Sequence, residues 1–198
     1  MSATATSLER RGAVAALLRD RGDALVVTGL GGTCWDVTAA GDNPLNFPMW
    51  GGMGGAAMVG LGLSLAQPDR RVLVITGDGE MLMGLGSIAT IAAAAPGNLA
   101  IAVIDNEHYG ETGMQPTHTG AGVDLAGMAE AAGFELTATV RNDDALTAFA
   151  GTALTAPGPI LGVIKVTTDR APLVMPPRDG ALLKDRFRTA LLGDGAAL

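Results

Sequence analysis

The chain has 198 residues, of which 48% are hydrophobic, and carries a formal net charge of −7 at pH 7. This length is typical of one domain, so residues 1–198 are interpreted as a single domain. The acidic balance excludes a broad basic surface, and we therefore expect no nucleic-acid partner.

The amino-terminal half alternates helical patterns with short apolar runs. Apolar residues at helical spacing predict a helix over residues 8–20, which Gly22 ends. The following pattern predicts a strand over 24–28, a glycine-rich turn at 29–32, a short helix with Thr33 as candidate N-cap, an extended segment at 45–50, a helix over 51–66 and a strand over 71–76.

The carboxyl-terminal half continues the same alternation. It predicts a helix over about 80–95, a strand over 99–104, an irregular loop at 107–122, a helix over about 124–133, a strand over 134–140, a helix over 143–155, a strand over 160–166 and a helix over about 180–192. Strands that are apolar on both faces are typical of parallel sheets. The predicted fold is therefore α/β, a doubly wound, mostly parallel sheet with helices on both faces.

The sequence predicts no membrane-spanning helix, signal peptide or disulfide bond. The apolar stretches at 51–66 and 81–95 are shorter than the ~20 residues of a membrane span. Residues 1–11 lack the apolar core of a signal peptide. The single Cys34 excludes an intrachain disulfide and is interpreted as a small core residue. We expect a cytoplasmic protein without a membrane partner.

Two polar motifs follow consecutive predicted strands. Gly-Asp-Gly-Glu stands at residues 77–80, and Asp-Asn stands at residues 105–106. The residues between the motifs suffice for one helix and one strand, so we expect neighbouring strands whose carboxyl ends meet at one edge, where α/β sheets bind ligands. Oxygen ligands from Asp78 and Asn106 suit Mg²⁺, and the glycines let a diphosphate approach the backbone.

The strand context carries this prediction, because the tripeptide alone is weak evidence. Residues 193–195 repeat Gly-Asp-Gly without a preceding strand, and we interpret them as a frayed tail. The simpler alternative at the first motif is that Asp78 only caps the helix that follows it.

The residues around both motifs resemble those of thiamine diphosphate (ThDP)-dependent 2-oxo acid decarboxylases. Residues 77–91 and 105–119 are similar to sulfopyruvate and phosphonopyruvate decarboxylases, and the similarity runs from about residue 10 to 168. The chain's size resembles that of the separate beta subunit of sulfopyruvate decarboxylase. The resemblance implies the diphosphate-binding domain of such an enzyme, with ThDP and Mg²⁺ as cofactors and a 2-oxo acid converted to an aldehyde and carbon dioxide.

The resemblance also implies roles for individual residues. Asp78, Asn106 and the backbone carbonyl of His108 would hold Mg²⁺, and the Met53 side chain would keep ThDP bent. The alternative for Met53 is ordinary packing. The cofactor-binding residues implied in this way are Gly51, Gly52, Met53, Gly77, Asp78, Gly79, Glu80, Asn106, His108, Tyr109 and Gly110.

Two residues of the 107–122 loop are candidates for catalysis, namely His118 and Glu111. His118 has a side chain suited to proton transfer near neutral pH, although a loop histidine is commonly solvated. Glu111 departs from the Ser-Thr-Gly that is frequent in the family, and its carboxylate would repel an anionic substrate unless it points away or pairs with a cation. The sequence does not decide whether four residues of this loop line the site or brace the loop, namely Tyr109, Glu111, Thr112 and Gln115. Four basic residues could each bind an anion or form a surface salt bridge, namely Arg141, Lys165, Arg170 and Arg178.

The resemblance further implies a missing component. Such enzymes use a glutamate from a pyrimidine-binding domain, and none of this chain's glutamates lies in an upstream domain. We therefore expect a hetero-oligomer in which a separate alpha-type subunit supplies that glutamate, with a small 2-oxo acid as substrate. The alternatives are an acetolactate synthase-like carboligating enzyme, a ferredoxin-dependent oxidoreductase subunit, a non-catalytic scaffold subunit and a nucleotide-binding Rossmann domain.

Overall fold

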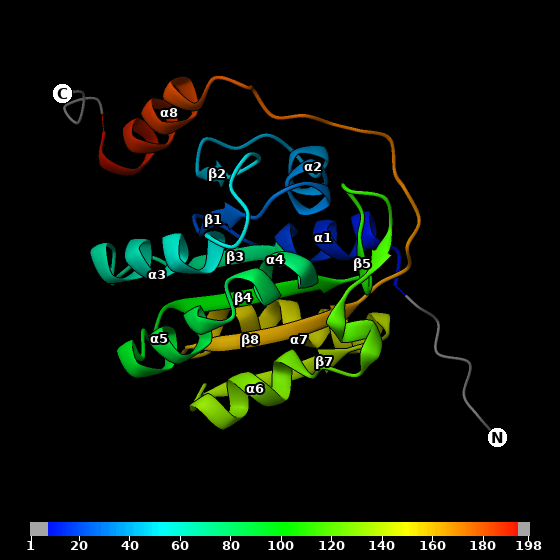
Figure 1. Ribbon diagram of the computed structural model, residues 1–198. Helices are drawn as coiled ribbons and strands as arrows, with labels where there is room; N and C mark the ends of the chain where they lie inside the picture. The colour runs from blue at the N-terminus through cyan, green and yellow to red at the C-terminus, as the bar shows by residue number, and fades with distance from the viewer. Residues whose placement is uncertain (1–7, 194–198) are drawn as a thin grey trace.

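A six-stranded sheet lies between two layers of helices in the computed structural model, which describes residues 8–193 (Figure 1). Its strands run in the order β2-β1-β3-β4-β8-β7, and every pair is parallel. The strands are β1 (Leu25–Thr28), β2 (Asn46–Pro48), β3 (Val72–Gly77), β4 (Leu99–Asp105), β7 (Leu136–Val140) and β8 (Ile160–Lys165). The predicted doubly wound parallel sheet is confirmed.

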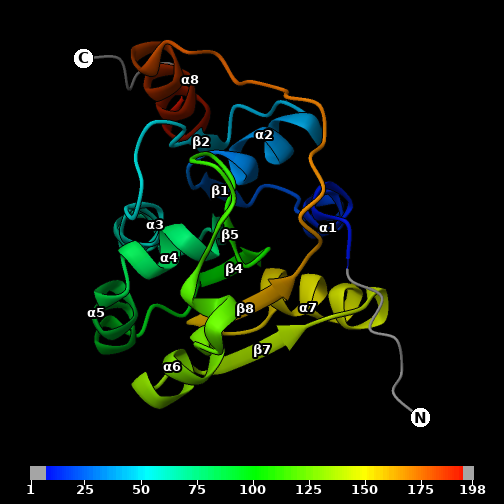
Figure 2. The ribbon, with the colours of Figure 1, turned by 45° about the vertical axis from the view of Figure 1, so that its right-hand side comes forward.

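Helices cover both faces of the sheet, as expected (Figure 2). One face carries α3 (Ala56–Ala66), α4 (Asp78–Met83), α5 (Gly86–Ala94) and α6 (Leu125–Ala132), and the other carries α1 (Arg10–Leu18), α2 (Gly32–Ala39) and α7 (Asp143–Thr155). Within β3, Val72 and Val74 pack into the first layer, while Leu73 and Ile75 pack into the second. Each such fully buried aliphatic side chain contributes about 1.5–3 kcal/mol, so both layers hold the sheet.

The last helix, α8 (Gly180–Leu192), lies beside the edge strand β2. A long segment carries the chain from β8 along the outside of the molecule to this helix (Figure 1). The rings of Phe47 and Phe187 meet edge to face at 5.4 Å, and Arg186 forms a two-pronged ion pair with Asp42 at 2.6 and 3.0 Å. These contacts fix the helix over the sheet edge.

Three local predictions are wrong for tertiary reasons. The helix expected at 80–95 is split into α4 and α5, because Gly84 lies against the Gly54 carbonyl, where a Cβ would be 2.3 Å from that oxygen. The helix expected from residue 51 begins only at Ala56, after a turn in which Gly54 has a φ of +83°. Thr33 lies inside α2, whose N-cap is Gly31.

The expected irregular loop at 107–122 contains a small hairpin. Strands β5 (His108–Tyr109) and β6 (Gln115–Pro116) pair antiparallel, and the 3₁₀ helix η1 (His118–Ala121) follows. Of the repeated tripeptide, only Gly193 belongs to the described residues; Asp194 and Gly195 lie outside them. Within residues 8–193, no helix is long and apolar enough to cross a membrane.

Candidate functional site

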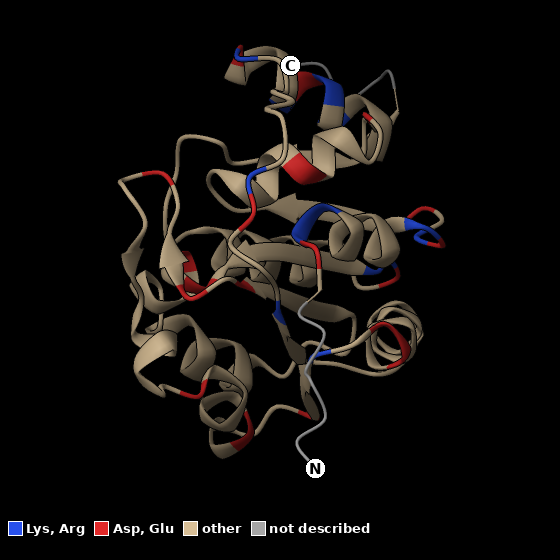
Figure 3. Ribbon diagram, turned by 90° about the vertical axis from the view of Figure 1, so that its right-hand side faces the viewer, with Lys and Arg blue, Asp and Glu red and all other residues tan. Residues whose placement is uncertain are grey.

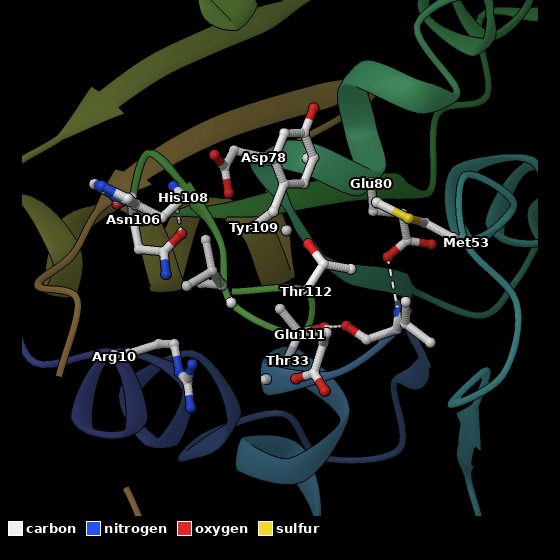
Figure 4. A pocket seen from close by; sticks show the side chains of 16 residues that line it. Arg10, Thr33, Met53, Asp78, Glu80, Asn106, His108, Tyr109, Glu111 and Thr112 are labelled. Carbon is white, nitrogen blue, oxygen red and sulfur yellow. Dashed lines mark hydrogen bonds between the residues drawn. The ribbon is translucent and has the colours of Figure 1, made fainter. Parts of the chain in front are cut away.

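The two polar motifs lie at one edge of the sheet. Strands β3 and β4 pair in a register that sets Gly77 opposite Ile104, so Asp78 and Asn106 follow neighbouring strand ends. An open pocket lies there (Figure 4). It is lined by Arg10, Leu30, Gly32, Thr33, Met53, Gly77, Asp78, Gly79, Glu80, Ile104, Asn106, His108, Tyr109, Gly110, Glu111 and Thr112. Residues that follow β1, β3 and β4 thus meet where the strand order reverses, the usual ligand position in such sheets.

Most of the predicted site residues line this pocket, but three do not. Gly51 and Gly52 lie in the turn between β2 and α3, beside the pocket-lining Met53. His118 is exposed at the start of η1, outside the pocket lining. Glu111, the other catalytic candidate, lines the pocket, and its carboxylate lies over the Gly31 backbone.

Asp78 is a buried carboxyl group, with only 3% of the residue exposed. Thr117 Oγ1 donates a hydrogen bond to its Oδ2 atom at 2.5 Å. Burial raises the pKa of Asp78 to about 6; the Thr117 hydrogen bond lowers it, and the nearby Asp105 charge raises it further. The protein therefore holds this carboxylate in a place that favours a positive partner.

A chain of side chains connects Asp78 to Asp105 and Lys165, the last residues of β4 and β8. The hydroxyls of Thr117 and Thr119 lie 2.9 Å apart, and Thr119 donates to Asp105 Oδ1 at 2.8 Å. Asp105 Oδ2 in turn pairs with Lys165 Nζ at 2.7 Å. This network attaches the end of the hairpin to both strand ends, so it fixes the wall that follows Asn106.

The backbone is strained at Glu107, the residue that follows the second motif. Glu107 adopts a φ of 62°, in the left-handed region that glycine favours. Asn106 Oδ1 accepts a hydrogen bond from the His108 amide at 3.0 Å, and the Glu107 carbonyl accepts one from Thr117 at 2.8 Å. Such strain is typical of sites where function fixes the backbone.

The donor set fits Mg²⁺ better than a transition metal. Among the described residues, no group of three or more His, Cys, Asp and Glu side chains is arranged to hold a metal ion. The expected set has one carboxylate, one amide oxygen and one backbone carbonyl, from Asp78, Asn106 and His108. Mg²⁺ is commonly bound by one or two carboxylates together with phosphate oxygens and water, so this short set suffices beside a diphosphate.

Glycine at position 79 is required by the pocket wall. A Cβ there would lie 2.4 Å from the Tyr109 ring, so only glycine allows this ring to rest against the start of α4. At the hairpin tip, Thr112 Oγ1 donates to Gln115 Oε1 at 2.9 Å, and Gln115 Nε2 donates to the Thr112 carbonyl at 3.0 Å. Gln115 therefore braces the loop, while Tyr109 and Thr112 both line the pocket.

Glu80 connects three segments of the site through its buried side chain. Its carboxylate accepts hydrogen bonds from the Leu30 amide at 2.9 Å, from Thr76 Oγ1 at 2.9 Å and from the Ala56 amide at 3.4 Å. Burial raises the pKa of Glu80, and these hydrogen bonds act in the opposite direction. Glu80 was predicted as a cofactor-binding residue, and this bracing role of its side chain was not predicted.

The basic candidates of the sequence analysis lie outside the pocket lining. Lys165 pairs with Asp105 and Glu107, whose hydrogen bonds and charges raise its pKa against the opposing effect of burial. Arg170 donates to the Gly110 carbonyl at 3.3 Å. The basic residue that lines the pocket is instead Arg10, which belongs to no motif and comes from the distant start of α1.

Comparison with known proteins extends over most of the chain. Residues 33–164 match the family described as "Thiamine pyrophosphate enzyme, C-terminal TPP binding domain". The chain is 37% identical over 180 residues to "Sulfopyruvate decarboxylase subunit beta" of Methanothermobacter thermautotrophicus, covering 91% of this chain and 94% of that one. It is 43% identical over 139 residues to "Phosphonopyruvate decarboxylase" of Streptomyces viridochromogenes, covering 70% of this chain and 34% of that protein.

Solved structures show the same architecture. A putative thiamin diphosphate-dependent enzyme from Mycobacterium smegmatis has a TM-score of 0.71 at 26% identity, covering 83% of this chain and 32% of that one. Benzoylformate decarboxylase from Polynucleobacter necessarius also has a TM-score of 0.71, at 19% identity, covering 87% and 36%, which shows the shared fold. The chain thus spans about a third of these larger proteins.

Proposed function

The chain belongs to the thiamine pyrophosphate enzymes, whose C-terminal TPP-binding domain it matches, and we propose that it is the ThDP- and Mg²⁺-binding subunit of a 2-oxo acid decarboxylase. The observation that carries this proposal is the buried Asp78 carboxylate, which meets Asn106 and His108 in one pocket at the carboxyl ends of β3 and β4. Similarity along 94% of a sulfopyruvate decarboxylase beta subunit supports the choice of reaction.

In this proposal the chain orients the cofactor and screens its charge. Asp78, Asn106 and the His108 carbonyl would hold Mg²⁺, and Gly77, Gly79 and the backbone of Glu80 would border the diphosphate. When bound, ThDP supplies the electron sink for breaking the bond between the carboxyl group and the carbonyl carbon of the substrate. Gly51, Gly52 and Met53 would support the ring system, and Tyr109 and Gly110 would close the pocket wall.

We also propose that a separate alpha-type subunit completes the site. Three of the similar proteins are named as beta subunits of sulfopyruvate decarboxylase, which supports this reading. Of the two catalytic candidates, Glu111 is the better placed to contact substrate, because it lines the pocket. His118 is exposed in this chain, so a role in proton transfer requires the partner's surface to enclose it.

The test is reconstitution with the product of the neighbouring gene. We expect the purified complex to convert a 2-oxo acid such as sulfopyruvate or phosphonopyruvate to an aldehyde and carbon dioxide, and to need both ThDP and Mg²⁺. Product analysis separates decarboxylation from carboligation. Decarboxylation by the pure chain would refute the partner requirement, and a complex inactive on the whole panel of 2-oxo acids would refute the proposed reaction.

The metal assignment is tested by Asp78→Asn in the same complex. This change removes the charge but keeps the shape and the acceptor for Thr117. We expect Mg²⁺-dependent ThDP binding to fall by roughly a hundredfold or more, measured by calorimetry, because a buried charged ligand is lost. Unchanged binding would refute Asp78 as a ligand.

A further inference from the structure

We propose that Arg10, which lines the pocket from the start of α1, binds the diphosphate group of the cofactor; this inference rests on the proposed function. The pocket needs such a contact because its charge is unbalanced. Among the described residues that line it, Arg10 is the only Lys or Arg, and it shares the lining with Asp78, Glu80 and Glu111. A diphosphate beside three carboxyl groups is repelled unless cations face it, and arginine suits phosphate oxygens through its planar fork.

The guanidinium of Arg10 is held in place by a buried ion pair. Arg10 Nε lies 2.5 Å from Asp36 Oδ2, and Arg11 Nε lies 3.0 Å from Asp36 Oδ1. Asp36 is fully buried, and two arginines share its single charge. The side chains of Arg10, Arg11 and Asp36 together carry one excess positive charge, next to the acidic N-cap residue Glu9. Figure 3 shows the basic residues at the start of α1 in blue.

The free side of this guanidinium faces the glycine turn. Arg10 Nη1 takes no part in the contacts with Asp36. It lies over the backbone of Gly32, where a Cβ would come within 2.5 Å of it. Because Gly32 itself lines the pocket, this arrangement presents a donor to the cavity and leaves no room for a side chain between them.

The position along the pocket favours the diphosphate over the substrate. In the view of Figure 4, Arg10 lies on the same side as Asn106 and His108, and Met53 lies on the opposite side. If Asn106 and His108 hold the metal and Met53 supports the rings, Arg10 lies at the phosphate end. A sulfonate or phosphonate of the substrate would present similar oxygen atoms, so the experiment must separate the two sources.

The experiment compares three variants of the full-length chain in its complex. Arg10→Gln removes the proposed contact, Asp78→Asn tests the metal site, and Arg19→Gln is the control, since Arg19 is an exposed arginine at the end of the same helix. Calorimetry measures the affinity for ThDP and, separately, for inorganic pyrophosphate, each with Mg²⁺. We expect Arg10→Gln to weaken both by roughly tenfold or more, and Arg19→Gln to leave both unchanged.

The outcomes distinguish the two proposals. Equal affinities in Arg10→Gln and the unmodified complex, with binding lost in Asp78→Asn, would overturn the role of Arg10 alone. The same result with a raised KM for the 2-oxo acid would move Arg10 to the substrate and also overturn it. An unmodified complex that binds neither probe would overturn the proposed cofactor site and this inference together.

A second variant tests the position without removing the charge. In Gly32→Ala the new methyl group would displace the Arg10 guanidinium, so we expect weaker binding of Mg²⁺-pyrophosphate with the fold retained, checked by circular dichroism. The control is Gly62→Ala, because a Cβ at position 62 would meet nothing within 4 Å. Gly41→Ala would not serve, because Gly41 has a φ of +131°, which alanine rarely adopts. Equal loss in both glycine variants would contradict the specific contact.

Discussion

At the scale of single residues, the pocket contains two carboxyl groups that the fold buries away from water, those of Asp78 and Glu80. Asp78 and Glu80 both have raised pKa values because they are buried, and Asp105 adds its charge to the field at Asp78. Hydroxyl and amide donors stabilise these charges only in part. A bound cation would stabilise the charged forms of these carboxyl groups further. Without the metal, keeping them ionised therefore costs the folded chain electrostatic free energy.

The first prediction concerns stability against pH in the metal-free chain. The pKa of Asp78 is raised from 3.8 to about 6, so the folded chain binds this proton more tightly than the unfolded chain. The resulting stabilisation is complete below about pH 4 and is lost as the pH rises through 6, which amounts to about 3 kcal/mol. We expect urea unfolding to show this fall, and Asp78→Asn to remove its own part of it while leaving that of Glu80. Parallel pH profiles for the two proteins would contradict the prediction.

The second prediction concerns Met53, which lines the pocket while 39% of it remains exposed. If its side chain keeps the cofactor bent, Met53→Ala should change the affinity for Mg²⁺-ThDP by less than roughly threefold and slow turnover of the complex roughly tenfold or more, because misalignment affects the reacting atoms. Met128→Ala, equally exposed but on α6, is the matched control. An unaltered turnover rate would remove this role.

At the scale of elements, helix α3 shows how closely the first helical layer approaches the sheet. A Cβ on Gly60 would lie 2.3 Å from Val74 Cγ2, so this glycine allows the helix to rest on β3. Gly62, in the same helix, meets nothing within 4 Å. One helix therefore contains a glycine that packing requires and one that it does not.

The third prediction uses this pair. Gly60→Ala should lower the free energy of unfolding by about 1–3 kcal/mol, because the methyl group overpacks the core. Gly62→Ala should raise it by about 0.5–1 kcal/mol, because alanine favours the helix. Thermal or urea unfolding measures both. Equal effects of the same sign would show that helix propensity, and not contact with β3, decides the result.

The sequence predicts the elements well where local pattern decides them. Strands β3 and β4 appear as uninterrupted apolar runs because both of their faces are buried. The break between α4 and α5 escapes such prediction, since it depends on Gly54 from another part of the chain. Hairpin β5–β6 escapes it as well, because strands of two residues are too short to show a period.

In the site, too, the sequence predicts what local pattern decides and misses what tertiary contacts decide. The motif glycines and their neighbouring strands predict where Asp78 and Asn106 lie. Arg10 was not predicted, because it reaches the pocket through the packing of α1 beside α2 and through Asp36, which no local pattern announces. Thr117 and Thr119 were not predicted either. They lie two positions apart on either side of His118, and this spacing could have indicated that the two threonines face the protein while His118 faces outward.

At the scale of the whole molecule, the sheet has one edge that a distant segment protects. Strand β2 pairs on one side with β1, and α8 packs against it through Phe187, which is buried. Unprotected edge strands pair readily with other chains. The carboxyl-terminal helix therefore shields β2 as well as adding to the core.

The fourth prediction tests this protection. Phe187→Ala should cost about 3–5 kcal/mol of unfolding free energy and increase aggregation on warming, measured by urea unfolding and light scattering. Leu182→Ala, at a position 52% exposed on the same helix, should change stability by less than about 0.5 kcal/mol. A Phe187 variant that loses stability without aggregating would show that the helix stabilises the fold but does not protect the edge.

The side chain of Glu80 also restricts the order in which the protein can have acquired its residues. A Cβ at position 29 would lie 1.6 Å from Glu80 Oε2, so alanine at position 29 would push the Glu80 carboxylate away from its hydrogen bonds with Leu30, Thr76 and Ala56. We therefore expect glycine at position 29 to precede glutamate at position 80 in a series of substitutions that keeps these hydrogen bonds. Relatives with a small residue at position 80 are released from this restriction, and the two positions should covary across the family.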